Sequence, residues 1–207
     1  MKAAFQKDDA LLADIVRARA EGRTRLWWLG QSGFLLHTPA GTVLFDPYLS
    51  DSLTKKYAAT DKPHTRITER VIVPERLTGI DVITSSHNHT DHLDAETLKP
   101  LLAANPKAKL VIPRANRAFV LERLGKVESA LVAVDAGECV TVMGIEFHGI
   151  TAAHNTVERD DHGGCRFLGY VARVGSKTIY HSGDTLMHDG LIPALEPFRV
   201  DVALVPI

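Results

Sequence analysis

Apolar residues follow a helical spacing near the start of the chain and a strand spacing directly after it. The helical stripe consists of Leu11, Leu12, Ile15, Val16 and Ala18. Arg17 and Arg19 fall outside this stripe, which predicts an amphipathic helix over residues 9–20 that packs on the body of the protein. Short apolar runs separated by glycine-containing turns then predict an antiparallel meander, with strands at 25–29, 34–37 and 42–45.

The segment at residues 48–79 is polar and has no continuous apolar pattern. It follows Asp46 and Pro47, which end the third predicted strand, and Pro63 and Pro74 exclude a long helix within it. Lysines and arginines slightly outnumber acidic residues here. A charged run usually faces water, so a solvated surface loop is favoured over a lid that meets an anionic substrate.

The middle of the chain alternates apolar strands with amphipathic helices. The predicted elements are a strand at 80–83, a helix between Asp94 and Asn105, a strand at 109–112, a helix at 115–124 and a strand at 131–134. Asp94 is a favourable N-cap for the first of these helices, and Asn105-Pro106 ends it. This part of the chain therefore has the order β-α-β-α-β.

Strands dominate again after residue 134. The predicted elements are a hairpin of 139–142 with 145–153, a hairpin of 167–174 with 177–181, a weak helix at 186–198 and a strongly apolar strand at 200–205. Met143 and Gly144 form the turn of the first hairpin, and Pro193 breaks the weak helix. An apolar strand is an unusual natural terminus, so we expect the chain to be a fragment.

The composition is that of an ordinary soluble protein, and we expect one domain over residues 1–207. With 45% hydrophobic residues and a formal net charge of −1, no nucleic-acid partner is expected and a small-molecule partner is. An export signal and a membrane-length apolar run are both absent from the sequence, which predicts a cytoplasmic protein without membrane insertion. Cys139 and Cys165 could form a disulfide, but reduced core thiols are favoured. The sequence carries no signal for the oligomeric state.

Metal-binding side chains are concentrated at residues 86–94, Ser-His-Asn-His-Thr-Asp-His-Leu-Asp. Alternation along an extended segment puts His87 and His89 on the same side, so both imidazoles can reach one cation. Asp91 and His92 point elsewhere, which suits a second, adjacent cation. Imidazole and carboxylate ligands without a thiolate favour Zn or Mn, with Fe or Ni as alternatives, at one or two ions per chain. Chance histidines in a polar loop are the alternative, which the ligand density makes improbable.

A loop of this kind needs further ligands from elsewhere in the chain. His154 and Asp184 each follow an apolar strand, where binding residues are commonly mounted. Gly183 allows a tight backbone turn, so the Asp184 carboxylate could bridge two cations. The alternatives are a strand-end histidine without a ligand role and an Asx-turn aspartate.

Several motifs together resemble one known family. They are Trp27-Trp28-Leu29-Gly30, Asp46-Pro47, residues 86–94, His154 and Tyr180-His181-Ser182-Gly183-Asp184. The sequence resembles the metallo-β-lactamase superfamily, and within it the branch with L-ascorbate-6-phosphate lactonase and the N-acyl-phosphatidylethanolamine phospholipase D-like enzymes. The resemblance implies an α+β fold, a four-layer αββα sandwich, and we expect this chain to lack the C-terminal strands and helix of that fold.

The resemblance also implies a two-metal site. Its ligands would be His87, His89 and His154 at the first metal, Asp91 and His92 at the second, and Asp184 as the bridge. The family completes its second site with a histidine beyond the strand that here begins at Val200, and none follows in this sequence. We expect the natural protein to continue past Ile207 and supply it.

The implied chemistry is metal-assisted hydrolysis, with Asp91 as the catalytic residue that orients the attacking water or accepts its proton. Asp46 is a candidate to fix a ligand imidazole through its other nitrogen, although an aspartate before proline is also a common turn residue. His162 is a candidate substrate contact, but an ordinary loop residue is favoured. His181 is a weaker candidate for the site, since a hydrogen-bonded core histidine is favoured there.

Two hypotheses of function follow. The first is a metal-dependent hydrolase, of lactonase or phosphodiesterase type, that cleaves a lactone, another ester or a phosphodiester in a small, possibly anionic molecule. The second is a non-catalytic metal-binding or interaction protein that keeps the fold with a degraded second metal site.

Overall fold

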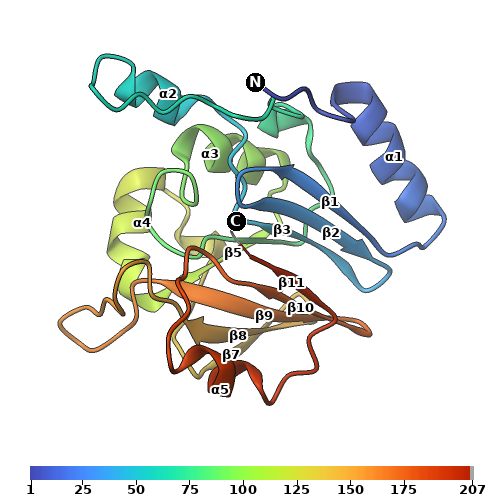
Figure 1. The fold of residues 1–207 in the computed structure, drawn as a ribbon. Coiled ribbons are helices and arrows are strands. Elements are labelled where there is room, and N and C mark those ends of the chain that lie inside the picture. The colour runs from blue at the N-terminus through green and yellow to red at the C-terminus, as the bar shows by residue number, and fades with distance from the viewer. Residues whose placement is uncertain (206–207) are drawn as a thin grey trace.

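The computed structural model describes residues 1–205, whose strands form two sheets packed face to face (Figure 1). Within these residues the first sheet has the strand order β1-β2-β3-β4-β5-β6. Its strands are β1 Arg25–Gly30, β2 Gly33–Thr38, β3 Gly41–Phe45, β4 Val82–Thr84, β5 Lys109–Pro113 and β6 Leu131–Val134. The predicted meander is present as the antiparallel pairs of β1, β2 and β3, and the strands from β3 to β6 pair in parallel.

The second sheet has the order β11-β10-β9-β8-β7 over the same range of residues. Its strands are β7 Cys139–Val142, β8 Ile145–Thr151, β9 Leu168–Val174, β10 Lys177–His181 and β11 Val202–Leu204. β7 to β10 pair antiparallel, and β11 pairs in parallel with β10. Met143 and Gly144 both have positive φ, at 52° and 81°. This is the geometry that a tight two-residue hairpin requires.

Helices cover the outer faces of both sheets (Figure 1). They are α1 Asp8–Ala20, α3 Ala95–Ala104 and α4 Arg117–Leu124 on the first sheet and α5 Leu191–Leu195 on the second, whereas α2 Ser52–Tyr57 lies away from the sheets. Short 3-10 turns lie at Pro74–Arg76, Arg114–Asn116 and Glu128–Ala130. One apolar cluster joins α1, α3 and α4 to the first sheet, a second lies between the sheets around Phe45 and Phe147, and a third joins Leu191 of α5 to the second sheet. The predicted α+β, four-layer αββα arrangement is confirmed.

Several local predictions differ from the structure. Val16, predicted in the buried helix stripe, is 62% exposed, whereas Asp14, which the stripe left out, is buried beside Ile15. The weak helix at 186–198 shortens to α5, Leu191–Leu195, and Pro193 lies in its first turn, where proline is tolerated, instead of breaking it. Within residues 1–205, β11 is the outermost strand of the second sheet, Val202 is 38% exposed and Leu204 is the buried residue of the strand.

Both cysteines are free, as expected. Cys165 is buried, whereas Cys139 is exposed on β7, so the expectation of a core thiol is wrong for Cys139. Across residues 1–205, every helix is too short or too polar to cross a membrane.

The Asp14 carboxylate ties α1 to β1. Trp27 Nε1 donates a hydrogen bond to Asp14 Oδ2 at 2.9 Å, and Arg25 Nη1 donates to both oxygens at 2.6 and 2.8 Å. The Trp27 hydrogen bond and the neighbouring arginines hold the pKa of Asp14 below its ordinary value despite burial. Replacing Asp14 by alanine is expected to lower the free energy of unfolding at pH 7 by about 1–3 kcal/mol, since Trp27 loses its acceptor. Urea denaturation measures this change.

The Asp14 effect is expected to depend on pH. Because the folded-state pKa lies below the unfolded value of about 3.9, the carboxylate stabilises the fold above about pH 4, and that stability is lost as the pH falls through the folded-state pKa. Asp9→Ala is the control. Asp9 is an exposed residue of the same helix that pairs with Arg76, and loss of this surface ion pair should change the free energy of unfolding by less than about 0.5 kcal/mol. Equal losses in the two variants would contradict the assignment.

Candidate metal centre

The histidine-rich loop connects the end of β4 to the start of α3, at the edge where parallel strands of the first sheet end. Asp94 caps α3 by accepting a hydrogen bond from the backbone N–H of Glu96. Across the interface, Tyr170 Oη donates to the carbonyl of Ser85 at 3.0 Å, and the N–H of Leu168 donates to the carbonyl of Ser86 at 3.0 Å. The loop is therefore held by both sheets.

The three loop histidines converge. The ring centroid of His87 lies 4.6 Å from that of His89 and 4.0 Å from that of His92. His87 and His92 are 1% and 0% exposed, while His89 reaches the surface. Phe167 stacks against the His87 ring at 4.7 Å, which gives the buried side of the cluster an apolar wall.

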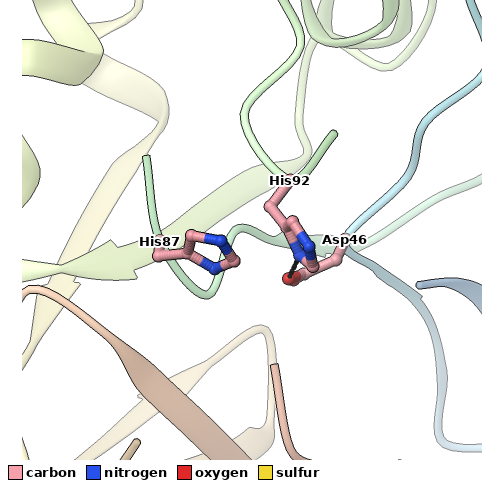
Figure 2. Close-up of side chains that lie close together, drawn as sticks. All are labelled: Asp46, His87 and His92. Atoms are coloured by element: carbon pink, nitrogen blue, oxygen red, sulfur yellow. Dashed lines mark hydrogen bonds and ion pairs between the residues drawn. The ribbon is translucent and has the colours of Figure 1, made fainter. Parts of the chain in front are cut away.

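Asp46, at the end of β3, orients one of these rings. Figure 2 shows the Asp46 carboxylate beside His92, where His92 Nδ1 lies 2.7 Å from Asp46 Oδ2. Asp46 also accepts hydrogen bonds from Thr84 Oγ1 at 2.7 Å and from the Ser86 N–H at 3.1 Å, as well as from Ser86 Oγ. Its φ of 36° is left-handed, and it is fully buried. A bond from Nδ1–H to this carboxylate leaves the Nε2 lone pair of His92 free.

Asp184 lies between the two buried histidines, just after β10. Its Oδ1 is 3.3 Å from His92 Nε2, and its Oδ2 is 3.9 Å from His87 Nε2. Oxygen and nitrogen ligands of one tetrahedral zinc ion stand about 3.3–3.5 Å apart, from bond lengths of about 2.0–2.2 Å. Asp184 thus presents one oxygen toward each imidazole, the arrangement that a bridging carboxylate needs.

Two atoms in this cluster test whether a metal fits. His87 Nε2 and His92 Nε2 are buried and have no hydrogen-bond partner of normal geometry within residues 1–205. A buried polar atom without a partner costs about 1–3 kcal/mol, so such atoms are rare unless a ligand satisfies them. Donor atoms of His87, His89 and Asp184 also lie within 4.8 Å of one another. The imidazole and carboxylate donors fit a divalent transition metal.

Burial and neighbouring charges set the ionisation of the cluster. Burial, reinforced by the charge on His92, lowers the pKa of His87 to about 2, so its imidazole is neutral and able to bind a cation. Burial also opposes charge on His92, but the close carboxylates of Asp184 and Asp46 outweigh it and raise the pKa of His92 to about 10. Without a metal the His92 ring is therefore charged at pH 7, and a cation bound at Nε2 would displace the proton there. Burial alone would raise the pKa of Asp184, but the contact with His92 outweighs it and lowers this pKa to about 2.

His154 and Asp91 lie next to this group. The His154 ring centroid is 4.9 Å from that of His89 and 6.2 Å from that of His87. Asp91 Oδ2 is 3.8 Å from His92 Nε2. The structure therefore brings together His87, His89, Asp91, His92, His154 and Asp184, the six residues predicted as ligands.

His181 and His162 differ from those six. His181 Nε2 donates to the carbonyl of Ser32 at 2.9 Å, and its Nδ1 accepts from the Gly183 N–H at 3.3 Å, so both ring nitrogens are used by the backbone. The ring stacks on Phe45, at a centroid distance of 5.4 Å. His162 is exposed in the loop before β9, and the cavity beside the cluster is lined by other residues among those described.

That cavity has a volume of about 480 Å³. His89, Asp91, His154 and Asp184 form one side of it. The lining residues that sequence reasoning missed are Leu53, Lys56, Tyr57, His64, Phe119 and Arg123. Most of them come from α2 and the segment after it, which the sequence favoured as a solvated loop. No local pattern marks them, because only the tertiary fold brings that segment to the histidines.

Gly183 positions Asp184, and a side chain there is expected to disrupt the centre. Gly183 has φ of +56°, and a Cβ would lie 2.7 Å from Ser86 Cβ and 2.8 Å from the Leu168 carbonyl oxygen. Gly183→Ala should lower stability by about 1–3 kcal/mol and weaken metal binding at least about 10-fold, measured by thermal unfolding and metal titration. Gly163→Ala is the control, since it shares the positive φ but has open space around its Cβ. Similar metal affinities in the two variants would contradict this role.

The two packed sheets and the histidine-rich loop define a protein of the metallo-β-lactamase type. Residues 25–207 match the sequence profile described as the beta-lactamase superfamily domain, and the chain belongs to this family. The lactonase and phospholipase-like branch is not distinguished by this match.

Curated relatives share the description UPF0173 metal-dependent hydrolase. The protein of Myxococcus xanthus is 29% identical over 199 residues, which cover 92% of this chain and 62% of the relative. The protein of Anaeromyxobacter dehalogenans strain 2CP-1 is 32% identical over 206 residues, which cover 89% and 65%. The chain thus spans less than two thirds of the length of these two relatives.

Solved structures share the fold at low identity. CmlA, a diiron β-hydroxylase from Streptomyces venezuelae, has a TM-score of 0.64 and 20% identity, with 87% of this chain and 34% of that chain covered. A possible metal-dependent hydrolase from Veillonella parvula has a TM-score of 0.63 and 19% identity, with 87% and 69% covered. At these identities the similarity concerns the fold.

Proposed function

We propose that this chain is a metal-dependent hydrolase that cleaves an ester-like bond in a small molecule. The observation that carries the proposal is the pair of buried Nε2 atoms of His87 and His92, which have no partner of normal hydrogen-bond geometry within residues 1–205 and face the two oxygens of Asp184. The description of the curated relatives as metal-dependent hydrolases supports it.

The proposed ligand sets are His87, His89 and His154 for one ion, Asp91 and His92 for the other, and Asp184 between them. The short distances from Asp184 to the two buried imidazoles support the bridging role. Because all of these donors are nitrogen or oxygen, we propose Zn or Mn as the metal, with Fe or Ni as alternatives.

When bound, the metal would polarise a carbonyl or phosphoryl oxygen and make water a nucleophile near neutral pH. Side chains of the protein would position the attacking water and the ligand imidazoles. Asp91, 28% exposed at the cavity, is placed to accept the proton of the attacking water. Asp46 holds the His92 tautomer, and Phe167 excludes water from the buried face of His87.

The proposed substrate is a lactone, another ester or a phosphodiester, in keeping with the lactonase and phospholipase-like branch that the motifs resemble. Lys56, on α2, lines the cavity and is exposed, so it can meet a negatively charged group of the substrate. Arg123 also lines the cavity, but its Nη1 donates to the carbonyls of Asn88 and Leu93 and so supports the histidine loop.

The test is to measure bound metal in the purified protein and then to assay a panel of small lactones and bis(4-nitrophenyl) phosphate with each candidate metal added. Turnover that requires metal and follows its occupancy would support the hydrolase. Full metal occupancy without turnover of either substrate class would contradict it and favour the non-catalytic metal-binding protein.

Lys56→Ala is expected to raise KM for an anionic substrate about 5- to 50-fold with little change in kcat, because a charge pair near the surface contributes mainly to binding. Lys55→Ala is the matched control, since the neighbouring Lys55 pairs with Glu96 at 2.9 Å instead of lining the cavity. Steady-state kinetics on charged and neutral substrates measures the separate changes in KM and kcat. Equal effects of the two variants would contradict a role for Lys56 in binding.

A further inference from the structure

A second group of metal-binding side chains lies on the other sheet. Cys139 of β7 and His148 of β8 are directly opposite each other in the antiparallel register, and Glu146 is two residues before His148. Because side chains two apart in a strand share a face, all three point to the same side. That side is the outer face, since Phe147, between Glu146 and His148, points into the core between the sheets.

The donor atoms of this group stand at the separations that one tetrahedral ion requires. Cys139 Sγ lies 3.6 Å from His148 Nε2, and His148 Nε2 lies 3.4 Å from Glu146 Oε2. Zinc–sulfur, zinc–nitrogen and zinc–oxygen bonds of about 2.3, 2.0–2.1 and 2.0–2.2 Å predict edges of about 3.5–3.6 Å for sulfur to nitrogen and about 3.3–3.5 Å for nitrogen to oxygen. All three donor atoms fall within 4.8 Å of one another.

We infer that Cys139, Glu146 and His148 form a separate surface site for a thiophilic divalent cation of the zinc class, with solvent as the fourth ligand. One thiolate, one imidazole and one carboxylate suit zinc and its close substitutes cobalt and cadmium, and do not suit calcium or magnesium. Binding releases the thiol proton to solvent.

The site is open to solvent and joins two strands. The Glu146 side chain is 44% exposed and that of His148 is 20% exposed, so an ion can enter without rearrangement of the sheet. Within the described residues 1–205, β7 is an edge strand of the second sheet, and the ion would hold it to β8. Phe198 packs edge-on against His148, with 4.8 Å between centroids, and restrains the ring.

Arg173 is the competing group. Its Nη1 lies 3.2 Å from Glu146 Oε2, so its positive charge opposes a cation at the same carboxylate. Removal of the Arg173 charge should therefore strengthen cation binding, although it removes the ion pair with Glu146.

The experiment is a cobalt titration of the whole chain, followed by the thiolate-to-cobalt charge-transfer band in the near ultraviolet. The histidine-loop centre has no cysteine among its proposed ligands, so this band reports the second site alone. The wild type and Cys165→Ser are expected to show the band, and Cys139→Ser to lack it. His148→Gln should weaken cobalt binding at least about 10-fold, and Arg173→Gln should strengthen it severalfold.

Two outcomes would overturn the inference. The wild type could show no thiolate band at saturating cobalt, or the band could persist in Cys139→Ser and disappear in Cys165→Ser. Both serine variants replace one sulfur by oxygen, and circular dichroism verifies that each is folded before titration.

Discussion

Replacing His87 and His89 together by alanine is expected to abolish binding of the ion assigned to these two histidines and to reduce metal-dependent hydrolysis to background. The two imidazoles supply adjacent donors of one proposed ion, and His87 Nε2 is buried without another partner within residues 1–205. Elemental analysis after dialysis measures the loss.

The measurement is made in a Cys139→Ser background, so that metal held by the thiol on β7 does not contribute. His162→Ala is the control, because it also removes an imidazole but from an exposed loop outside the cavity lining. Unchanged metal content in the double variant would reject the assignment of the centre. The free energy of unfolding of the metal-free variants shows whether metal is lost because ligands are missing or because the fold is disrupted.

Replacing Asp46 by asparagine is expected to lower metal affinity about 10–100-fold and turnover at least as much, although Asp46 itself need not bind metal. Asp46 accepts at both oxygens, from Thr84, Ser86 and His92, so an amide N–H2 must face at least one of these donors. If it faces His92 Nδ1, the proton moves to Nε2 and blocks the atom that points at Asp184. Calorimetric metal titration and kcat measure the effect.

Asp94→Asn is the matched control for Asp46→Asn. Asp94 is also a buried aspartate of the same region, 1% exposed, but it caps α3 and accepts from Ser52 and Thr97. Both variants should lose about 1–3 kcal/mol of stability, since buried donors lose a charged acceptor. Only Asp46→Asn should also lose metal affinity. If both variants bound metal equally well, the orienting role of Asp46 would be wrong.

Local sequence determined much of the fold. The spacing of apolar residues was sufficient for the meander, for the β-α-β-α-β unit and for both hairpins, because period-2 and period-3.6 patterns reflect which face of an element is buried. The prediction failed where burial depends on a distant partner. Asp14 is buried on α1 because Arg25 and Trp27 of β1 satisfy it, and Val16 is exposed because no part of residues 1–205 covers that side of the helix.

The candidate centre was likewise predictable from the sequence only in part. The loop at residues 86–94 carries its ligands in one stretch, so the sequence by itself indicated a metal, and the strand-end positions of His154 and Asp184 were visible too. The sequence could not decide between a turn role and an orienting role for Asp46. That depends on contact between the end of β3 and a ring 46 residues later, which exists only in the folded sheet.

Tertiary structure alone decided the surroundings of the centre and the presence of a second cluster. Lys56 and Tyr57 reach the cavity because α2 folds toward the histidine loop, and a charged, proline-interrupted segment has no periodicity that encodes such an approach. Cys139 and His148 are nine residues apart and become neighbours through strand register. Ligands within one loop can be predicted from spacing, whereas ligands and orienting groups on separate strands are brought together only by the packing of the sheets.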